Sequence, residues 1–297
     1  MTGSGIRLKS GEFLWLWIFL LPTLVGLLLG TLGPVLAAFG ISFTDWDVLT
    51  SPRFIELENY KRLIADPTFS QALKNTLYYV GGMVPISTIL SLFFALMMNQ
   101  KLRGITLYRT AYFMPVVSST VAVALVWSWI YSVDFGLLNY LLRQVGISPV
   151  GWLSSTTWAM PAVIIMSIWG NLGVGIVIFL AGLQSISASY YEAAEVDGAN
   201  RWQQFRNITL PLITPSLFFY FIITMIDAFQ AFESIYIMTR GGPVNSTTTM
   251  VYYIYRNAFR NFKMGYASAQ AIVLFLVIMA LTLIYWKLQE RWVTYDV

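Results

Sequence analysis

The stretch YYEAAEVDGANRWQQFRNITLP, residues 190–211, places a short polar unit between two long apolar segments. It holds Glu192, Glu195 and Asp197, although only 11% of the chain is charged. The residues before Gly198 are good helix formers, and a glycine in this position commonly ends a helix in the left-handed conformation. We therefore predict a short acidic helix that ends at Gly198.

The same stretch predicts a second short helix and the start of an apolar one. Asn200 can cap a helix from Arg201 to about residue 208, and Pro211 suits the first turn of the helix that follows. Ala193 and Ala194 offer so little bulk that another surface can approach the backbone closely. Two interpretations fit these features: a docking site at a membrane face, or an amphipathic connector that covers the polar end of a helix bundle.

Composition assigns the rest of the chain to the membrane. Of its 297 residues, 57% are hydrophobic, and the mean hydropathy is +0.66. Long charge-free apolar runs mark membrane-spanning helices, each of which needs about 20 residues to cross the hydrocarbon. We expect an all-α polytopic protein with six transmembrane helices. Their predicted ranges are 13–38, 72–99, 107–131, 158–184, 211–238 and 266–289.

The predicted spans leave three polar segments. Residues 1–12 and 291–297 form the termini, and residues 185–210 form the loop that carries the acidic helix. Pro22 and Pro34 predict kinks within the first span rather than its end. An even number of spans puts both termini on one side. Lys and Arg are equally numerous on the two sides but denser in the shorter segments on the side of the termini, which favours termini inside.

Several classes of chemistry are excluded by missing residue types. The chain has no cysteine and no histidine, so thiol catalysis, thiolate or imidazole metal sites and histidine-based triads are impossible. No glycine-rich phosphate loop is present, so the chain cannot bind ATP by that route. The net charge of +4 is scattered over the loops, which is typical of membrane flanks rather than of a nucleic-acid surface. We expect no catalytic site, no metal site and no nucleic-acid partner.

A polar stripe follows the fifth predicted span at helical spacing. Its members are Tyr220, Thr224, Asp227, Gln230 or Ala231, and Ser234. A carboxylate such as that of Asp227 is costly in the membrane and normally faces a cavity or polar neighbours. The stripe therefore predicts either a substrate pathway or a polar contact that holds helices together.

The fourth predicted span offers further candidates in the stretch IWGNLGVGI. Trp169 and Asn171 suit the CH faces and hydroxyls of a sugar. A tryptophan beside Gly170, Gly173 and Gly175 fits close helix packing equally well.

The stretch EAAEVDGANRWQQFRNITLP resembles the EAA loop of the permeases of binding-protein-dependent ABC importers. The matching positions are Glu192, Ala193, Ala194, Asp197, Gly198, Ala199, Ile208, Leu210 and Pro211. MTRGGPVNSTTTMVYYIYRNAFRNFKMGYASAQAIVLFL resembles the last outer loop and final span of the carbohydrate-uptake class. FTDWDVL, LENYKRLIADPTF, KNTLYY and YFMPVVSSTVAVALVW extend the resemblance over almost the whole chain. Glu56 departs from it, since relatives often carry glycine there.

The resemblance implies a type I ABC importer permease bundle that works as one part of a complex. The implied partners are a second homologous permease subunit, a cytoplasmic ATPase dimer that binds the ATP and Mg, and an extracytoplasmic solute-binding protein. It also implies that the EAA loop is the coupling helix, that both termini are cytoplasmic, and that the protein lies in the lipid of a bacterial inner membrane.

The implied cargo is a neutral sugar, an oligosaccharide or a polyol-glycoside, moved by alternating access. An unpaired Asp227 would repel an anion, which disfavours the alternative, a glycerol-3-phosphate-type permease. An ion-coupled secondary transporter is the alternative from another class. It would need more intramembrane ionisable groups than Asp227 and Glu233.

Overall fold

The computed structural model describes residues 10–100 and 104–294. Contacts between residues divide the chain into two units. The first unit is formed by the chain up to Leu63 together with Arg256–Val273. The second is formed by Ile64–Tyr255 together with the chain from Leu274 onward.

The first unit begins with a long apolar helix made of α1 (Ser10–Leu27), η1 (Leu28–Leu32) and α2 (Gly33–Ile41). Pro22 and Pro34 both lie inside it, as predicted, and neither ends it. The widened π-turn η1 lies directly before α2, whose second residue, Pro34, carries no N–H and has a ring that crowds the preceding turn.

A small polar framework completes the first unit. Strands β1 (Thr44–Asp45) and β2 (Arg53–Phe54) pair in antiparallel fashion. The buried Asn59, in helix α3 (Glu58–Ala65), donates hydrogen bonds to the carbonyl oxygens of Ser42 and Thr44. The π-turn η3 (Arg256–Arg260) and the first residues of α15 (Met264–Gln289) also belong to this unit.

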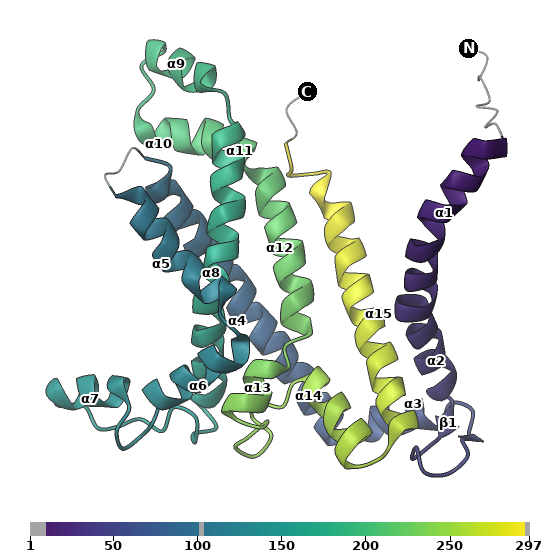
Figure 1. Ribbon diagram of the computed structural model, residues 1–297. Coiled ribbons are helices and arrows are strands. Elements are labelled where there is room, and N and C mark those ends of the chain that lie inside the picture. Colours follow the sequence, from purple (N-terminus) through teal and green to yellow (C-terminus); the bar gives the residue numbers. More distant parts are fainter. Residues whose placement is uncertain (1–9, 101–103, 295–297) are drawn as a thin grey trace. The chain divides into compact units, whose positions relative to one another are not determined.

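The second unit is built around three helices, α4 (Pro67–Met98), α8 (Ala159–Ser185) and α12 (Thr214–Phe229), which run side by side (Figure 1). Small residues let them approach closely. A Cβ atom added to Gly175 of α8 would lie 2.5 Å from Cβ of Ser91 in α4 and 2.7 Å from Cζ of Tyr220 in α12.

Shorter helices lie at the two ends of this unit (Figure 1). At one end lie α9 and α10, followed by the turn and helix that lead into α12. At the other end lie α6, α7 and α13. The bounds are α5 Ile105–Val117, α6 Thr120–Ile130, α7 Leu137–Gln144, α9 Ala188–Val196, α10 Arg201–Gln204, η2 Phe205–Thr209, α11 Leu210–Leu212, α13 Glu233–Met238 and α14 Met250–Tyr255.

The single helix predicted over 107–131 is wrong, because the chain bends by 109° between α5 and α6. Ser118 and Ser119 both adopt extended backbone conformations at the bend. The Ser118 hydroxyl donates to the carbonyl oxygen of Met114, at a donor–acceptor distance of 2.9 Å. Serine side chains can compete in this way with helical backbone hydrogen bonds, and such bonds often bend helices.

The single helix predicted over 211–238 is also wrong, because it is interrupted at residues 230–232. The interruption frees backbone groups that a continuous helix would satisfy. The Thr249 hydroxyl donates to the carbonyl oxygen of Ala231 at 3.0 Å, and the Gln230 side chain donates to the carbonyl oxygen of Ile226 at 3.3 Å. At its start the same helix bends by 58° between Leu212 and Thr214.

The described residues thus contain four helices long and apolar enough to span a membrane, and up to six spans if each bent pair counts as one. The four are Trp15–Ile41, Pro67–Met98, Ala159–Ser185 and Met264–Gln289, and the bent pairs are Thr110–Val117 with Thr120–Ile130 and Arg201–Leu212 with Thr214–Phe229.

Candidate functional site

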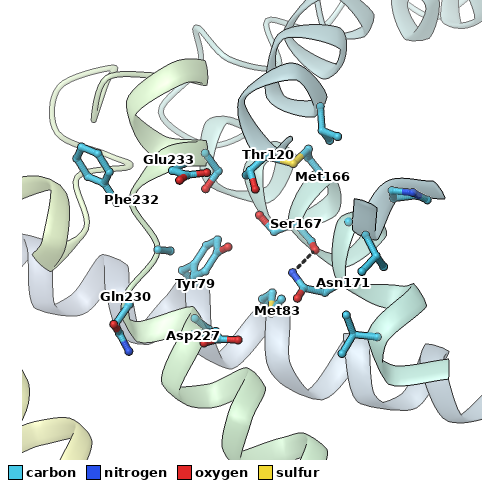
Figure 2. Close-up of a pocket in the computed structure, with 18 of the residues that line it drawn as sticks. Tyr79, Met83, Thr120, Met166, Ser167, Asn171, Asp227, Gln230, Phe232 and Glu233 are labelled. Carbon is cyan, nitrogen blue, oxygen red and sulfur yellow. Dashed lines mark hydrogen bonds between the residues drawn. The ribbon is translucent and has the colours of Figure 1, made fainter. Parts of the chain in front are cut away.

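The two helix interruptions lie beside one cavity in the second unit. It has a volume of about 610 Å³ and is lined by α4, α5, α6, α8, α12, α13 and the segments that join the broken pairs (Figure 2). Pro115, Ser118 and Thr120 contribute from the first interruption, and Gln230 and Phe232 from the second. Because irregular backbone at membrane depth is tolerated where it lines a cavity, this position explains why both breaks are stable.

Hydroxyl and amide groups from three helices meet in this cavity. The Tyr79 hydroxyl of α4 lines the cavity together with Ser167 of α8 and Ser234 of α13. The Asn171 side chain donates to the carbonyl oxygen of Ser167 at 3.0 Å. In Figure 2 the side chains of Tyr79, Asn171 and Asp227 extend into the same space. The lining can therefore hydrogen-bond a polar solute from several sides.

The charge of the cavity is carried by two carboxylates, Asp227 at the end of α12 and Glu233 at the start of α13. No Lys or Arg is found among the described lining residues. Two ion pairs within residues 10–100 and 104–294 involve other acids, Asp45 and Glu58. The cavity is thus suited to hydrogen-bond donors and unsuited to anions.

The predicted pathway residues divide into two groups. Asp227, Gln230 and Asn171 line the cavity, but Tyr220, Thr224 and Trp169 are not among its lining residues. The Tyr220 hydroxyl is buried and shares a hydrogen bond of 2.7 Å with that of Ser87. Thr224 is buried, and the Trp169 ring packs edge-to-face on Trp127.

The glycines of α8 have different surroundings. Gly170 lines the cavity, and an added Cβ atom there would meet nothing within 4 Å. A Cβ atom at Gly173 would lie 2.5 Å from a methyl group of Val116, and Gly175 is equally crowded. Close packing therefore explains Gly173 and Gly175, whereas Gly170 leaves room in the cavity.

The lining residues that sequence reasoning missed include Tyr79, Met83, Thr120, Ser167 and Phe232. The tyrosine offered one usable signal, since its hydroxyl requires a partner when it is buried in an apolar helix. The other four are residue types that are common in membrane segments, so the sequence gives no signal that they line a cavity.

The loop of residues 185–210 has the local structure that the sequence predicts. Helix α9 begins after Ser187, whose hydroxyl accepts from the backbone N–H of Ser189. It ends before Gly198, which has a left-handed φ of 78°. Asn200 caps α10 and forms a reciprocal pair of hydrogen bonds with Gln203.

The loop residues predicted to contact an ATPase are mostly accessible. Glu192, Ala193, Asp197 and Gly198 are exposed. Three residues are partly buried: Ala194, Ala199 and Pro211. A Cβ atom added at Gly198 would meet nothing within 4 Å among the residues that the structure describes. The loop therefore presents acids, an alanine and a glycine on an open surface.

The sequence matches the family model described as "Binding-protein-dependent transport system inner membrane component" over residues 76–295. It is 40% identical to the probable ABC transporter permease protein YesP of Bacillus subtilis, over 100% of this chain and 99% of that protein. It is 33% identical to the trehalose/maltose transport system permease protein MalF of Thermococcus litoralis, over 95% of both chains. It is 34% identical to the sn-glycerol-3-phosphate transport system permease protein UgpA of Yersinia pestis, over 95% and 96%.

A solved structure has the same fold. It is a chain of a bacterial alginate ABC transporter in complex with an alginate pentasaccharide-bound periplasmic protein. The match has a TM-score of 0.83 and 26% sequence identity, and it covers 95% of this chain and 96% of that chain. Together with the apolar helices, these matches identify a multi-pass membrane protein. The chain belongs to the family of binding-protein-dependent transport system inner membrane components.

Proposed function

We propose that this chain is the membrane-spanning permease subunit of an ATP-driven ABC importer for a neutral sugar, an oligosaccharide or a polyol-glycoside. The observation that carries the proposal is the cavity of about 610 Å³ at the two helix interruptions. It combines hydrogen-bonding groups with two carboxylates in a chain whose relatives include sugar permeases.

The lining favours a neutral polyhydroxylated cargo. Sugars offer hydroxyl donors to carboxylates such as Asp227 and Glu233, and hydroxyl acceptors to amides such as Asn171. Aromatic rings at Tyr79 and Phe232 suit the apolar CH faces of a sugar ring. The relative UgpA is named for sn-glycerol-3-phosphate, which supports a second candidate cargo. The two unneutralised carboxylates favour the neutral one, because they repel a phosphate in a medium of low dielectric constant.

The transport cycle that we propose is alternating access across six spans, in which each bent pair counts as one span. A rigid-body switch driven by ATP would open the cavity to each side in turn. The required partners are a second homologous permease subunit, a cytoplasmic ATPase dimer that binds ATP and Mg, and an extracytoplasmic solute-binding protein. The ATPase would contact Glu192, Asp197 and Gly198. Both termini would then be cytoplasmic, in a bacterial inner membrane.

The test is ATP-dependent uptake by the reconstituted complex. Proteoliposomes are assayed with radiolabelled maltose, trehalose and lactose, each with and without an excess of sn-glycerol 3-phosphate. We expect ATP-dependent uptake of at least one sugar, with little inhibition by the phosphate. Preferential uptake of sn-glycerol 3-phosphate would favour the alternative cargo, and uptake that follows an ion gradient without ATP would refute the importer class.

A series at Gly170 links uptake to the cavity. Replacement by Ala, Val and Leu fills open space in steps, so uptake should fall as the side chain grows. Gly81→Leu is the matched control, because Gly81 lies on the exposed face of α4 and also has open space around it. Equal uptake in all four variants would contradict a role for this cavity.

A further inference from the structure

Helix α9 is joined to the rest of the described chain by few interactions. None of its residues is buried. In the described part of the chain, one side-chain hydrogen bond links α9 to another element. It joins the hydroxyl oxygens of Tyr191 and Thr209, which lie 2.9 Å apart. The two residues are 18 positions apart, so this bond links the segment before Gly198 to the segment after α10.

Thr209 stands where the loop becomes part of a membrane helix. It is the last residue of η2, is 6% exposed, and accepts a backbone hydrogen bond of 3.0 Å from Ile213. Ile213 is buried against Phe179 and Tyr220 in the packed core between α8 and α12. Directly after Ile213 the chain bends by 58° into α12. A displacement of Thr209 is therefore transmitted to the start of α12.

The chain between α9 and Thr209 runs through a turn at Gly198, which has a left-handed φ of 78°. Short-range hydrogen bonds hold this turn: the N–H of Gly198 donates to the carbonyl oxygen of Glu195 and that of Ala199 to the carbonyl oxygen of Ala194. Without the Tyr191–Thr209 hydrogen bond, only this turn and α10 would set the position of α9 relative to η2. With the Tyr191–Thr209 hydrogen bond in place, α9, α10 and η2 are linked at both ends and would move together.

We propose that the Tyr191–Thr209 hydrogen bond is the strut that transmits movement of α9 to α12, so that both residues are positioning residues for coupled transport. The other end of α12 carries Asp227, which lines the cavity. A push on the exposed face of α9 is thus converted into movement of the cavity wall. This inference rests on the proposed function, since it assigns the path by which ATPase movement reaches the cargo.

The test measures the coupling ratio, which is the number of sugar molecules imported per ATP hydrolysed by the reconstituted complex. The sugar is the member of the maltose, trehalose and lactose panel that the wild-type complex imports. Tyr191→Phe and Thr209→Val each remove one hydroxyl and keep the shape of the side chain. Each should lower the ratio about two- to tenfold, the range that corresponds to one net hydrogen bond.

Two controls separate the strut from general damage. Tyr190→Phe removes the neighbouring hydroxyl, on a residue that is 45% exposed, and should leave the ratio unchanged. Thr209→Ser keeps a hydroxyl and should retain most of the coupling. The double variant Tyr191→Phe, Thr209→Val should be no worse than either single variant, because both remove the same bond.

The outcomes distinguish this inference from the proposed function. If the wild-type complex shows no ATP-dependent uptake of any sugar, the proposed function fails. If it transports normally and Tyr191→Phe keeps the wild-type ratio, or if the two single effects add, only the strut is overturned. A variant that loses uptake and ATP hydrolysis in equal proportion has an unchanged ratio and also overturns it.

Discussion

Replacement of Gly175 by alanine tests the packing on which the cavity depends. The new methyl carbon would lie 2.4 Å from Oγ of Ser91 and 2.7 Å from Cζ of Tyr220. These distances are far inside van der Waals contact, so at least one neighbour must move. Tyr220 is only 1% exposed, and its hydroxyl is held at 2.7 Å from that of Ser87. Its movement would break that hydrogen bond.

The expected loss follows from three terms. Overpacking of a well-packed interior costs about 1–3 kcal/mol. Loss of the buried Ser87–Tyr220 hydrogen bond adds about 1 kcal/mol. Alanine gains about 1 kcal/mol over glycine in the interior of a helix. The net effect of Gly175→Ala is a free energy of unfolding lowered by about 1–3 kcal/mol.

The assay is reversible unfolding of the purified subunit in mixed detergent micelles, followed by circular dichroism. Gly170→Ala in the same helix is the matched control, because its added Cβ atom meets nothing within 4 Å. The control should be as stable as the wild type or slightly more stable. A Gly175→Ala variant as stable as the control would refute the close approach of α4, α8 and α12.

Three further predictions concern the loop, the segment around α7 and the cavity. Gly198→Trp should abolish ATP-dependent uptake while the subunit still assembles, because a large side chain at this exposed turn would obstruct an ATPase that docks there. Gly198→Asn should keep most uptake, because asparagine tolerates the left-handed backbone. If uptake and stimulated ATP hydrolysis both survive Gly198→Trp, the proposed coupling role is contradicted. Asn139→Ala should make the segment around α7 sensitive to limited proteolysis, because the fully buried Asn139 side chain bonds both backbone groups of Val150; an unchanged cleavage rate would count against this bracing. Asp227→Asn should keep uptake of the neutral sugar and increase inhibition by sn-glycerol 3-phosphate, since it removes one of two carboxylates; identical inhibition would show that this carboxylate does not exclude anions.

The loop of residues 185–210 could be predicted in detail because its structure is decided locally. A left-handed glycine and an asparagine cap act on backbone groups within three or four residues, so Gly198 and Asn200 are readable from the sequence alone. The long apolar helices were predictable for a similar reason. Hydrophobic length is a property of one segment and needs no tertiary partner.

Composition alone does not predict the helix interruptions, and the second of them is stabilised by a tertiary contact. Charge-free windows treat Ser118 and Gln230 as ordinary span residues. The carbonyl oxygen of Ala231 becomes tolerable outside a helix because Thr249, from a distant segment, donates to it. The polar stripe predicted on one straight helix therefore includes Asp227. It cannot include Tyr79, which lines the cavity from another helix, α4.

The most direct test of the central claim is protection of the cavity by its cargo. Because the chain has no cysteine, a Gly170→Cys variant carries a single thiol in the cavity when the partner subunits are also made cysteine-free. The rate of its alkylation is measured in the reconstituted complex during turnover, with Gly81→Cys as the control. We predict that the imported sugar slows alkylation of the Gly170→Cys variant and leaves the control unchanged. Equal alkylation rates with and without saturating sugar would contradict the assignment of this cavity to the cargo path.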